Sequence, residues 1–258
     1  MDTKFPISTF IGKTSLFIVL LVGFQSTKAQ IVRIENNGIK ADSNLWSGGI
    51  DLNIYSIKNN SEFFKLAGGT QLKYAKDKNV VLSINELRLI FAEESNLENK
   101  GYQHFRYQHN FDSIYTLEAF SQTQFDQVLK IKLRQLFGIG PRFQLFSKAS
   151  GKIYLGVHYM YEYEEELETN LINRDHRISS HFAFSKTWDK SVVHWISYYQ
   201  PKINNFSDYR VSGSATYAIE LKKQLRFNIR GELTYDSHPV QGITDLTYTL
   251  LNGFSWEF

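Results

Sequence analysis

The chain has no cysteine and contains only four prolines in 258 residues. Without a thiol, the sequence offers no disulfide, no cysteine nucleophile and no cysteine-ligated metal site. No Ser-, Pro- or Gly-rich linker divides the chain, so we expect a single domain. After residue 30 no apolar run reaches the roughly 20 residues that a membrane-spanning helix needs. The sequence therefore argues against thiol chemistry and against a helical membrane protein.

The charges show no excess that would mark a polyanionic partner. Lysine and arginine total 29, and aspartate and glutamate total 26, without a basic run or stripe. We therefore expect no nucleic-acid partner. The seven histidines form no H-x-x-x-H or H-E-x-x-H pattern, so we expect no metal site and no other cofactor.

The first residues have the pattern of a secretory signal peptide. Lys4 and Lys13 accompany the short apolar run Leu16 to Phe24, and the small residues Thr27 and Ala29 follow it. The run is roughly half as long as a spanning helix, which favours a signal peptide over a membrane anchor or a buried first helix. We predict a signal peptide over 1–29, a polar periplasmic lead-in over 30–44 and one β-domain over 45–258.

Apolar and polar residues alternate with a period of two over most of the β-domain, and 15% of the chain is aromatic. About twelve strands fit this pattern, an even number, as a single-chain bacterial barrel requires. Short and long connections also alternate, and the long ones include Glu93 to Lys100 and Glu164 to His176. The pattern predicts an all-β fold, a closed antiparallel transmembrane β-barrel of about 12 strands in an up-and-down meander.

Alternation alone does not distinguish a membrane barrel from a soluble periplasmic β-protein, and that alternative stays open. The predicted strands are long for a soluble sheet, and aromatic residues gather at their ends. The last strand carries Phe254, Trp256 and Phe258 on its apolar row, which resembles the C-terminal signal that the outer-membrane barrel assembly machinery recognises. We expect a location in the cell outer membrane, with outer-membrane lipid, lipopolysaccharide and this machinery as partners.

Several segments resemble a known family. They are Leu136 to Arg142, Met160 to Glu164, Asp175 to Ser179, Phe206 to Arg210 and Tyr235 to Pro239. The chain resembles the domain-of-unknown-function family 481, typified by a salt-induced outer-membrane protein, over nearly all of Leu45 to Phe258. The resemblance implies an outer-membrane barrel, and it implies no activity and no functional residues.

No catalytic constellation stands out, and we do not expect an enzyme. The alternative is a lipid-modifying hydrolase, in which a histidine activates a serine on the same strand face. Ser179 and His181 share a face, but the alternation directs that face into the barrel, away from lipid. We therefore expect a polar pair in the lumen rather than a catalytic one.

Charged residues mark the predicted lumen. Lys130, Lys132, Arg134 and Arg142 lie on one strand face and form a predicted basic cluster. Either the lumen is plugged by ion pairs, or the cluster forms a narrow constriction that favours anions. The acidic run Glu164 to Glu166, with Glu162 and Glu168, is a solvated loop or a divalent-cation site that bridges to lipopolysaccharide. The sequence thus predicts a structural barrel or a narrow small-solute barrel.

Overall fold

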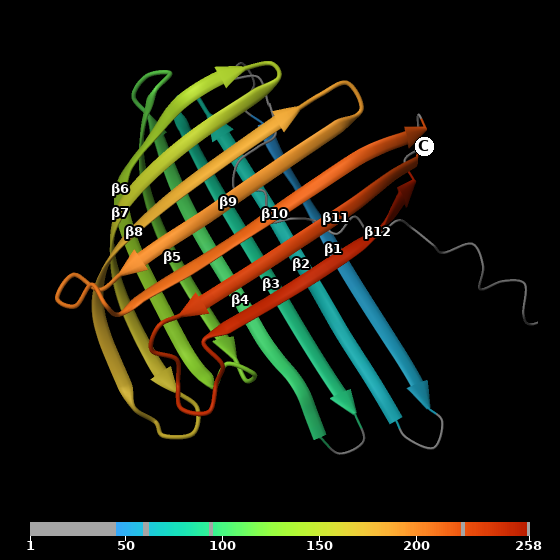
Figure 1. The fold of residues 1–258 in the computed structure, drawn as a ribbon, viewed down its shortest axis with the longest axis vertical. Helices are drawn as coiled ribbons and strands as arrows, with labels where there is room; N and C mark the ends of the chain where they lie inside the picture. Colours follow the sequence, from blue (N-terminus) through green and yellow to red (C-terminus); the bar gives the residue numbers. More distant parts are fainter. Residues whose placement is uncertain (1–44, 59–61, 93–94, 223–224, 257–258) are drawn as a thin grey trace, which may run out of the picture.

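A computed structural model describes residues 45–58, 62–92, 95–222 and 225–256, which form twelve β-strands (Figure 1). The strands are β1 (Leu45–Lys58), β2 (Glu62–Lys76), β3 (Asn79–Ala92), β4 (Ser95–Asn110), β5 (Tyr115–Asp126), β6 (Ile131–Lys148), β7 (Gly151–Glu166), β8 (Ile172–Thr187), β9 (Ser191–Pro201), β10 (Tyr209–Lys222), β11 (Leu225–Asp236) and β12 (Leu246–Trp256). The predicted all-β fold is confirmed. The predicted signal peptide and lead-in lie outside the described residues. In the described part of the chain, no helix is long and apolar enough to cross a membrane.

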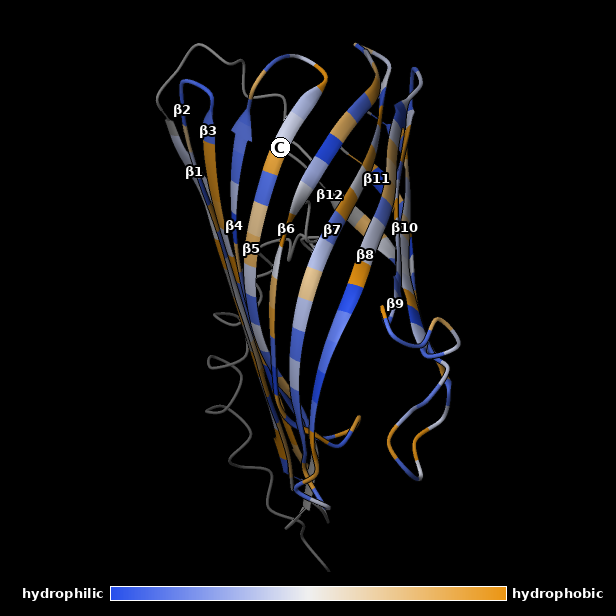
Figure 2. Ribbon diagram, turned by 90° about the vertical axis from the view of Figure 1, so that its left-hand side faces the viewer, coloured by the Kyte–Doolittle hydropathy of each residue, from blue (hydrophilic) through white to orange (hydrophobic). Residues whose placement is uncertain are grey.

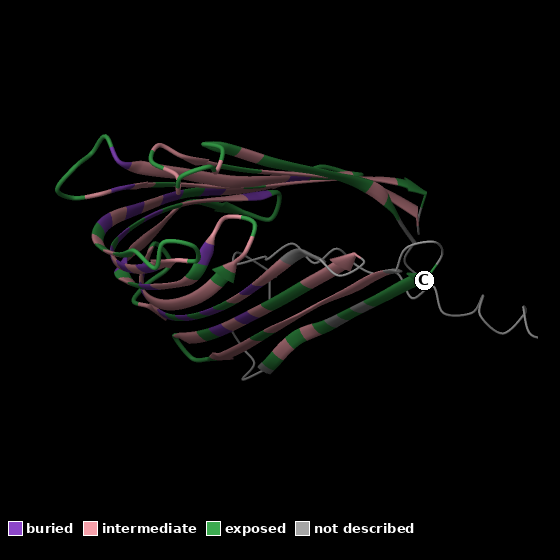
Figure 3. Ribbon diagram, turned by 90° about the horizontal axis from the view of Figure 1, so that it is seen from below, coloured by how far each residue is buried: buried purple, intermediate pink, exposed green. Residues whose placement is uncertain are grey.

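All twelve strands belong to one sheet, in which each strand pairs antiparallel with its neighbours in the chain. The predicted meander is therefore confirmed. The sheet bends back on itself, so that β1–β4 and β9–β12 form two facing walls joined through β5–β8 (Figures 1 and 3). Within the described residues no pairing joins β1 to β12, and the sheet is open there. Closure of the barrel thus stays a prediction.

The connections differ between the two ends of the sheet. Short turns at 77–78, 111–114, 149–150 and 188–190 define the short-turn end. The longest connections, 167–171, 202–208 and 237–245, define the long-loop end. Two predicted long loops are wrong: β4 already begins at Ser95, and β7 continues to Glu166.

The concave side of the bent sheet is its charged side. Glu162 in β7 forms an ion pair with Arg210 in β10, three strands away in the sheet, so both side chains point inward. Residues opposite each other in register share a face, and successive residues alternate between faces. This rule turns the apolar rows outward. The alternation of hydrophilic and hydrophobic residues along the strands is visible as bands in Figure 2. Exposed members of those rows include Ile50, Phe105, Phe137, Ile139, Tyr159, Phe182, Trp195, Ile229, Tyr248 and Phe254.

Close packing inside the bend depends on a glycine in β6. Gly138 lies opposite Phe120 of β5. A Cβ atom at position 138 would lie only 2.3 Å from the Phe120 ring. This glycine therefore leaves room for an inward aromatic ring on the neighbouring strand, as glycine commonly does where groups approach closely.

Candidate functional site

The first group of inward side chains surrounds Glu118 of β5. Its carboxylate is fully buried and lies 3.6 Å from Arg106 Nη1 and 3.2 Å from Arg142 Nη1. His158 Nε2 lies 3.1 Å from the same carboxylate, and Gln108 donates a hydrogen bond to it at 2.7 Å. We call these five residues the Glu118 cluster. It joins β4, β5, β6 and β7 on the concave side, because their inward rows meet there in register.

A second group, the Glu162 cluster, contains Glu162, Glu164, Arg134, Arg177 and Arg210. Glu162 is 1% exposed; it accepts a hydrogen bond from Arg177 Nε at 2.5 Å and lies 3.2 Å from Arg134 Nε. Arg210 of β10 pairs with Glu162 and, at 3.2 Å, with Glu164. Since β10 is not a sheet neighbour of β7, these pairs cross the concave side and tie one wall to the bend.

The Glu162 cluster continues into the loop 202–208. Asp208 Oδ1 lies 3.2 Å from Arg177 Nη2, and Asp208 Oδ2 lies 2.7 Å from Lys202 Nζ. Burial alone would raise the pKa of Asp208, but the hydrogen bond from Lys202 and the charge of Arg177 bring this pKa below its ordinary value. Burial alone would lower the pKa of Lys202, whereas hydrogen bonds to Asp208 and Asp175 raise it. The loop is thus fastened by charge-assisted contacts.

At the long-loop end, Lys130 connects three loops. Its Nζ donates to Glu168 Oε2 at 2.8 Å and to the Gln241 carbonyl at 3.2 Å. Lys130 belongs to the β5–β6 turn, Glu168 to the loop 167–171 and Gln241 to the loop 237–245. The last loop is therefore held toward the bend of the sheet.

The predicted basic cluster is divided between these sites. Lys130 and Lys132 lie at the long-loop end, and Lys132 donates to Glu165 at 2.6 Å. Arg134 lies in the Glu162 cluster and Arg142 in the Glu118 cluster. Each of the four cations thus has a carboxylate partner from another strand or loop.

The predicted acidic run is divided as well. Glu162 and Glu164 point inward to arginines, whereas Glu165 and Glu168 pair with the two lysines at the long-loop end. Among the described residues, no group of three or more carboxylates and histidines could hold a metal ion.

Ser179 and His181 are both buried on the concave side, at 3% and 2% exposure. The Ser179 hydroxyl accepts a hydrogen bond from Gln200 at 2.9 Å, and the His181 ring stacks on His158. Phe254 of the predicted assembly signal is 70% exposed on the convex side. Trp256 ends β12, and Phe258 lies outside the described residues.

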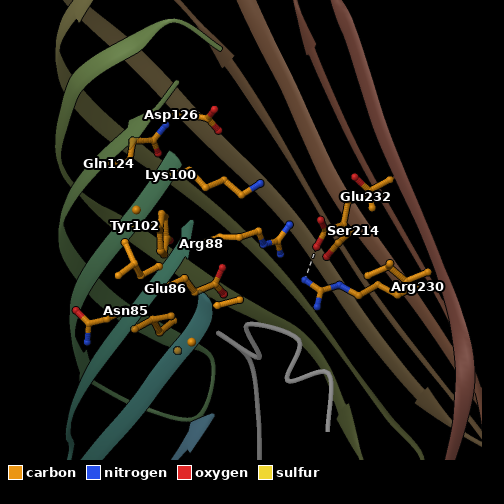
Figure 4. Close-up of a pocket in the computed structure, with 18 of the residues that line it drawn as sticks. Asn85, Glu86, Arg88, Lys100, Tyr102, Gln124, Asp126, Ser214, Arg230 and Glu232 are labelled. Carbon is orange, nitrogen blue, oxygen red and sulfur yellow. Dashed lines mark ion pairs between the residues drawn. The ribbon is translucent and has the colours of Figure 1, made fainter. Parts of the chain in front are cut away.

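The space between the two facing walls holds a cavity of about 1300 Å³. Its lining combines charged groups with apolar and aromatic ones (Figure 4). The charged residues are Lys65, Glu86, Arg88, Lys100, Asp126, Arg230 and Glu232. The concave side is therefore filled by ion pairs at the bend and hollow between the walls.

Three cations converge in this cavity. Arg88 of β3 and Lys100 of β4 extend from one wall, and Arg230 of β11 reaches toward them from the other (Figure 4). Arg230 forms an ion pair with Glu232 on its own strand. The sequence alone does not predict that these three cations lie together. The alternation in each strand does predict that each of the three cations points inward. Their proximity to one another depends on the bend of the sheet, which the alternation does not predict.

Two comparisons with known proteins found similarities. A family model described as "Protein of unknown function, DUF481" matches residues 55–256. A solved structure titled "NanC porin structure in rhombohedral crystal form" is similar over 81% of this chain and 100% of that chain. The sequence identity is 10% and the TM-score is 0.46. No curated protein matches the sequence.

Proposed function

We propose a function on the premise that the chain belongs to the DUF481 family, whose model covers most of its length. The proposed function is that of an outer-membrane β-barrel protein without catalytic activity, which serves as a structural barrel or as a narrow path for a small solute. The proposal rests on one observation, the inverted distribution of charge and apolar surface between the two faces of the sheet.

The buried residues include Arg106, Glu118, Glu162, Glu164 and Arg177, all at 4% exposure or less. The exposed residues include large apolar side chains on nearly every strand. In water this arrangement is unfavourable for two reasons: it buries charged side chains, and it exposes apolar side chains to solvent. In a bilayer the same apolar rows face lipid and the charges face one another, as in transmembrane barrels.

Closure between β1 and β12 follows from the same reasoning. A sheet edge carries unpaired N–H and C=O groups, and each such group costs several kcal/mol in hydrocarbon. The two edge strands expose apolar side chains as the other strands do, including Trp46 at 71%, Ile50 at 79% and Tyr248 at 77%. We propose that these strands pair in the membrane and that the walls then enclose the cavity.

The proposed lumen is narrow. The two ion-pair clusters fill the bend, so a solute path is restricted to the cavity between the walls. Barrels of about eight strands are filled by side chains and those of about sixteen to eighteen leave an aqueous channel, so for twelve strands the lining decides. We expect little or no steady ionic conductance across a planar bilayer, because the inward ion pairs occupy the bend. We also propose contacts of the convex side with outer-membrane lipid and lipopolysaccharide, and recognition of the last strand by the barrel assembly machinery.

The test compares two adjacent residues on opposite faces of β11. Ile229→Arg places a charge on the convex side, and Asn228→Arg places it on the concave side. If Ile229 faces the bilayer centre, its substitution costs about 2–4 kcal/mol in lipid vesicles, and that of Asn228 costs much less. Equal costs, or the reverse order, would indicate a soluble β-protein. The mobility of unboiled and boiled samples on a gel tests closure independently.

A further inference from the structure

Two of the cavity cations lie directly opposite each other. Arg88 of β3 is the register partner of Lys100 of β4, and both line the cavity. Like charges at directly opposed positions of an antiparallel pair repel and destabilise the sheet. Lys65 lies nearby, since it is two residues from Ala67, the register partner of Arg88 on β2. Three successive strands thus present positive charge to the same part of the cavity.

The opposite wall adds a fourth cation. The Arg230 guanidinium points toward the Arg88 guanidinium and the Lys100 ammonium across the cavity (Figure 4). Its partner Glu232 neutralises part of this charge, and Glu86 and Asp126 line the cavity as well. Among the described residues, the lining has four basic and three acidic side chains, and three of the four cations point toward one region of the cavity.

Apolar and aromatic side chains complete the cavity beside these cations. They include Tyr55, Phe63, Ile84, Tyr102 and Tyr198. A site of this composition suits a molecule with an anionic end and an apolar body, because burial favours the body and hydrogen-bonded cations favour the anion. A guanidinium beside an ammonium is a suitable receptor for a carboxylate, which accepts several hydrogen bonds at once.

We propose that the cavity binds a small organic carboxylate, with its anionic end at Arg88, Lys100 and Arg230 and its body among the aromatic side chains. The proposal rests on the proposed function, since it assigns a substrate class to the narrow path between the walls. The cavity cations are distinct from the predicted basic cluster, whose members form ion pairs at the long-loop end and in the Glu118 and Glu162 clusters; these members are Lys130, Lys132, Arg134 and Arg142.

The experiment measures binding of benzoate to the refolded full-length chain in a nonionic detergent by equilibrium dialysis. Benzyl alcohol is the uncharged probe of the same size. The variants are Arg88→Gln and Lys100→Gln, separately and together, and Lys132→Gln is the control for loss of a cation outside the cavity. We expect benzoate to bind more tightly than benzyl alcohol. Each cavity substitution should weaken benzoate binding about tenfold, because a hydrogen bond to a charged group is lost. Lys132→Gln should have no effect.

Two results would overturn the proposal: equal binding of the two probes, or equal loss of benzoate binding in Lys132→Gln and in the cavity variants. Gel mobility of the same samples separates this failure from failure of the proposed function. If a compact, heat-sensitive species forms but does not bind benzoate, the carboxylate site is refuted and the proposal of a closed barrel still stands. Binding that depends on Arg88 and Lys100 in a sample without the compact species supports the site and refutes the closed barrel.

Discussion

Removal of the Glu118 charge gives the sharpest test of the filled interior. The Glu118 carboxylate is 0% exposed, and the ion pairs of both Arg106 and Arg142 end on it. Glu118→Gln keeps the shape of the side chain and removes its charge. Loss of one partner from a buried ion pair typically costs about 3–5 kcal/mol, because the remaining charge stays in a medium of low polarity. We expect a loss of stability in this range.

Two controls use differences within the same molecule. Glu162 is equally buried, but each of its arginines has a second carboxylate: Glu164 for Arg134, Asp208 for Arg177 and Asp236 for Arg210. Glu162→Gln should therefore cost less, about 1–3 kcal/mol, as expected for lost hydrogen bonds to charged groups. Glu168 is 62% exposed, and Glu168→Gln should cost about 1 kcal/mol or less, as exposed pairs do.

The assay is urea unfolding of the refolded protein in lipid vesicles, followed by tryptophan fluorescence. The double variant Glu118→Gln with Arg106→Met should recover part of the lost stability, since it also removes one of the stranded cations. Equal losses in the three single variants would refute the reasoning. So would a Glu118→Gln variant as stable as the unmodified chain, because the cluster would then contribute nothing to the barrel.

Three further predictions concern the ends of the chain and of the sheet. Deletion of Phe258 should leave secretion intact and block membrane assembly, measured by fractionation; assembly at the normal level would remove this residue from the signal. Asp112 accepts hydrogen bonds from the backbone N–H groups of Tyr115 and Ile114, which lower its pKa below the ordinary value of 3.8. The contribution of Asp112 to stability is therefore complete above pH 3.8 and is lost as the pH falls through its lowered pKa. Asp112→Asn should make the pH dependence of acid unfolding less steep in this range. An unchanged pH profile would contradict this role of Asp112. Lys130 has a backbone φ of 56°, a conformation that asparagine also adopts, so Lys130→Asn removes the side-chain contact without straining the backbone. This substitution should release the loop 237–245 and speed thermolysin cleavage before Ile243. Cleavage at the original rate would show that the contact does not hold the loop.

For most strands the sequence was sufficient to predict which residues face inward, because a strand has only two faces; the stretch from Val192 to Tyr199 is apolar on both faces, and its direction was not predictable. Phe137 and Ile139 are exposed on the convex side, and Arg134 and Arg142 point into the bend. The pairing of these charges was not predictable. Arg142 meets Glu118 through the register of β5 and β6. Side-chain periodicity excludes a shift of one residue, which would reverse the faces, but it does not distinguish registers that differ by two residues.

The errors in the loops have a physical origin too. The charge of the run from Glu164 favours a solvated loop, yet Glu164 is 3% exposed and remains in β7 beside Arg134 and Arg210. The same assumption placed Lys100 at the end of a loop. In the structure it is paired with Arg88 in the sheet, and for this reason the cavity cations were missed as a group.

The meander has a consequence for how the protein forms. Every pairing in the described sheet joins strands that are adjacent in the chain, so each hairpin can form soon after its two strands are available. Pairing of β1 with β12 would be different, since it brings together segments from opposite ends of the domain. Until that step is complete, both edges can template a strand from another molecule. If the barrel closes as proposed, the slowest event in its formation would be the joining of its ends, and the yield of closed barrels over aggregates would depend on how quickly the cell brings the two edge strands together.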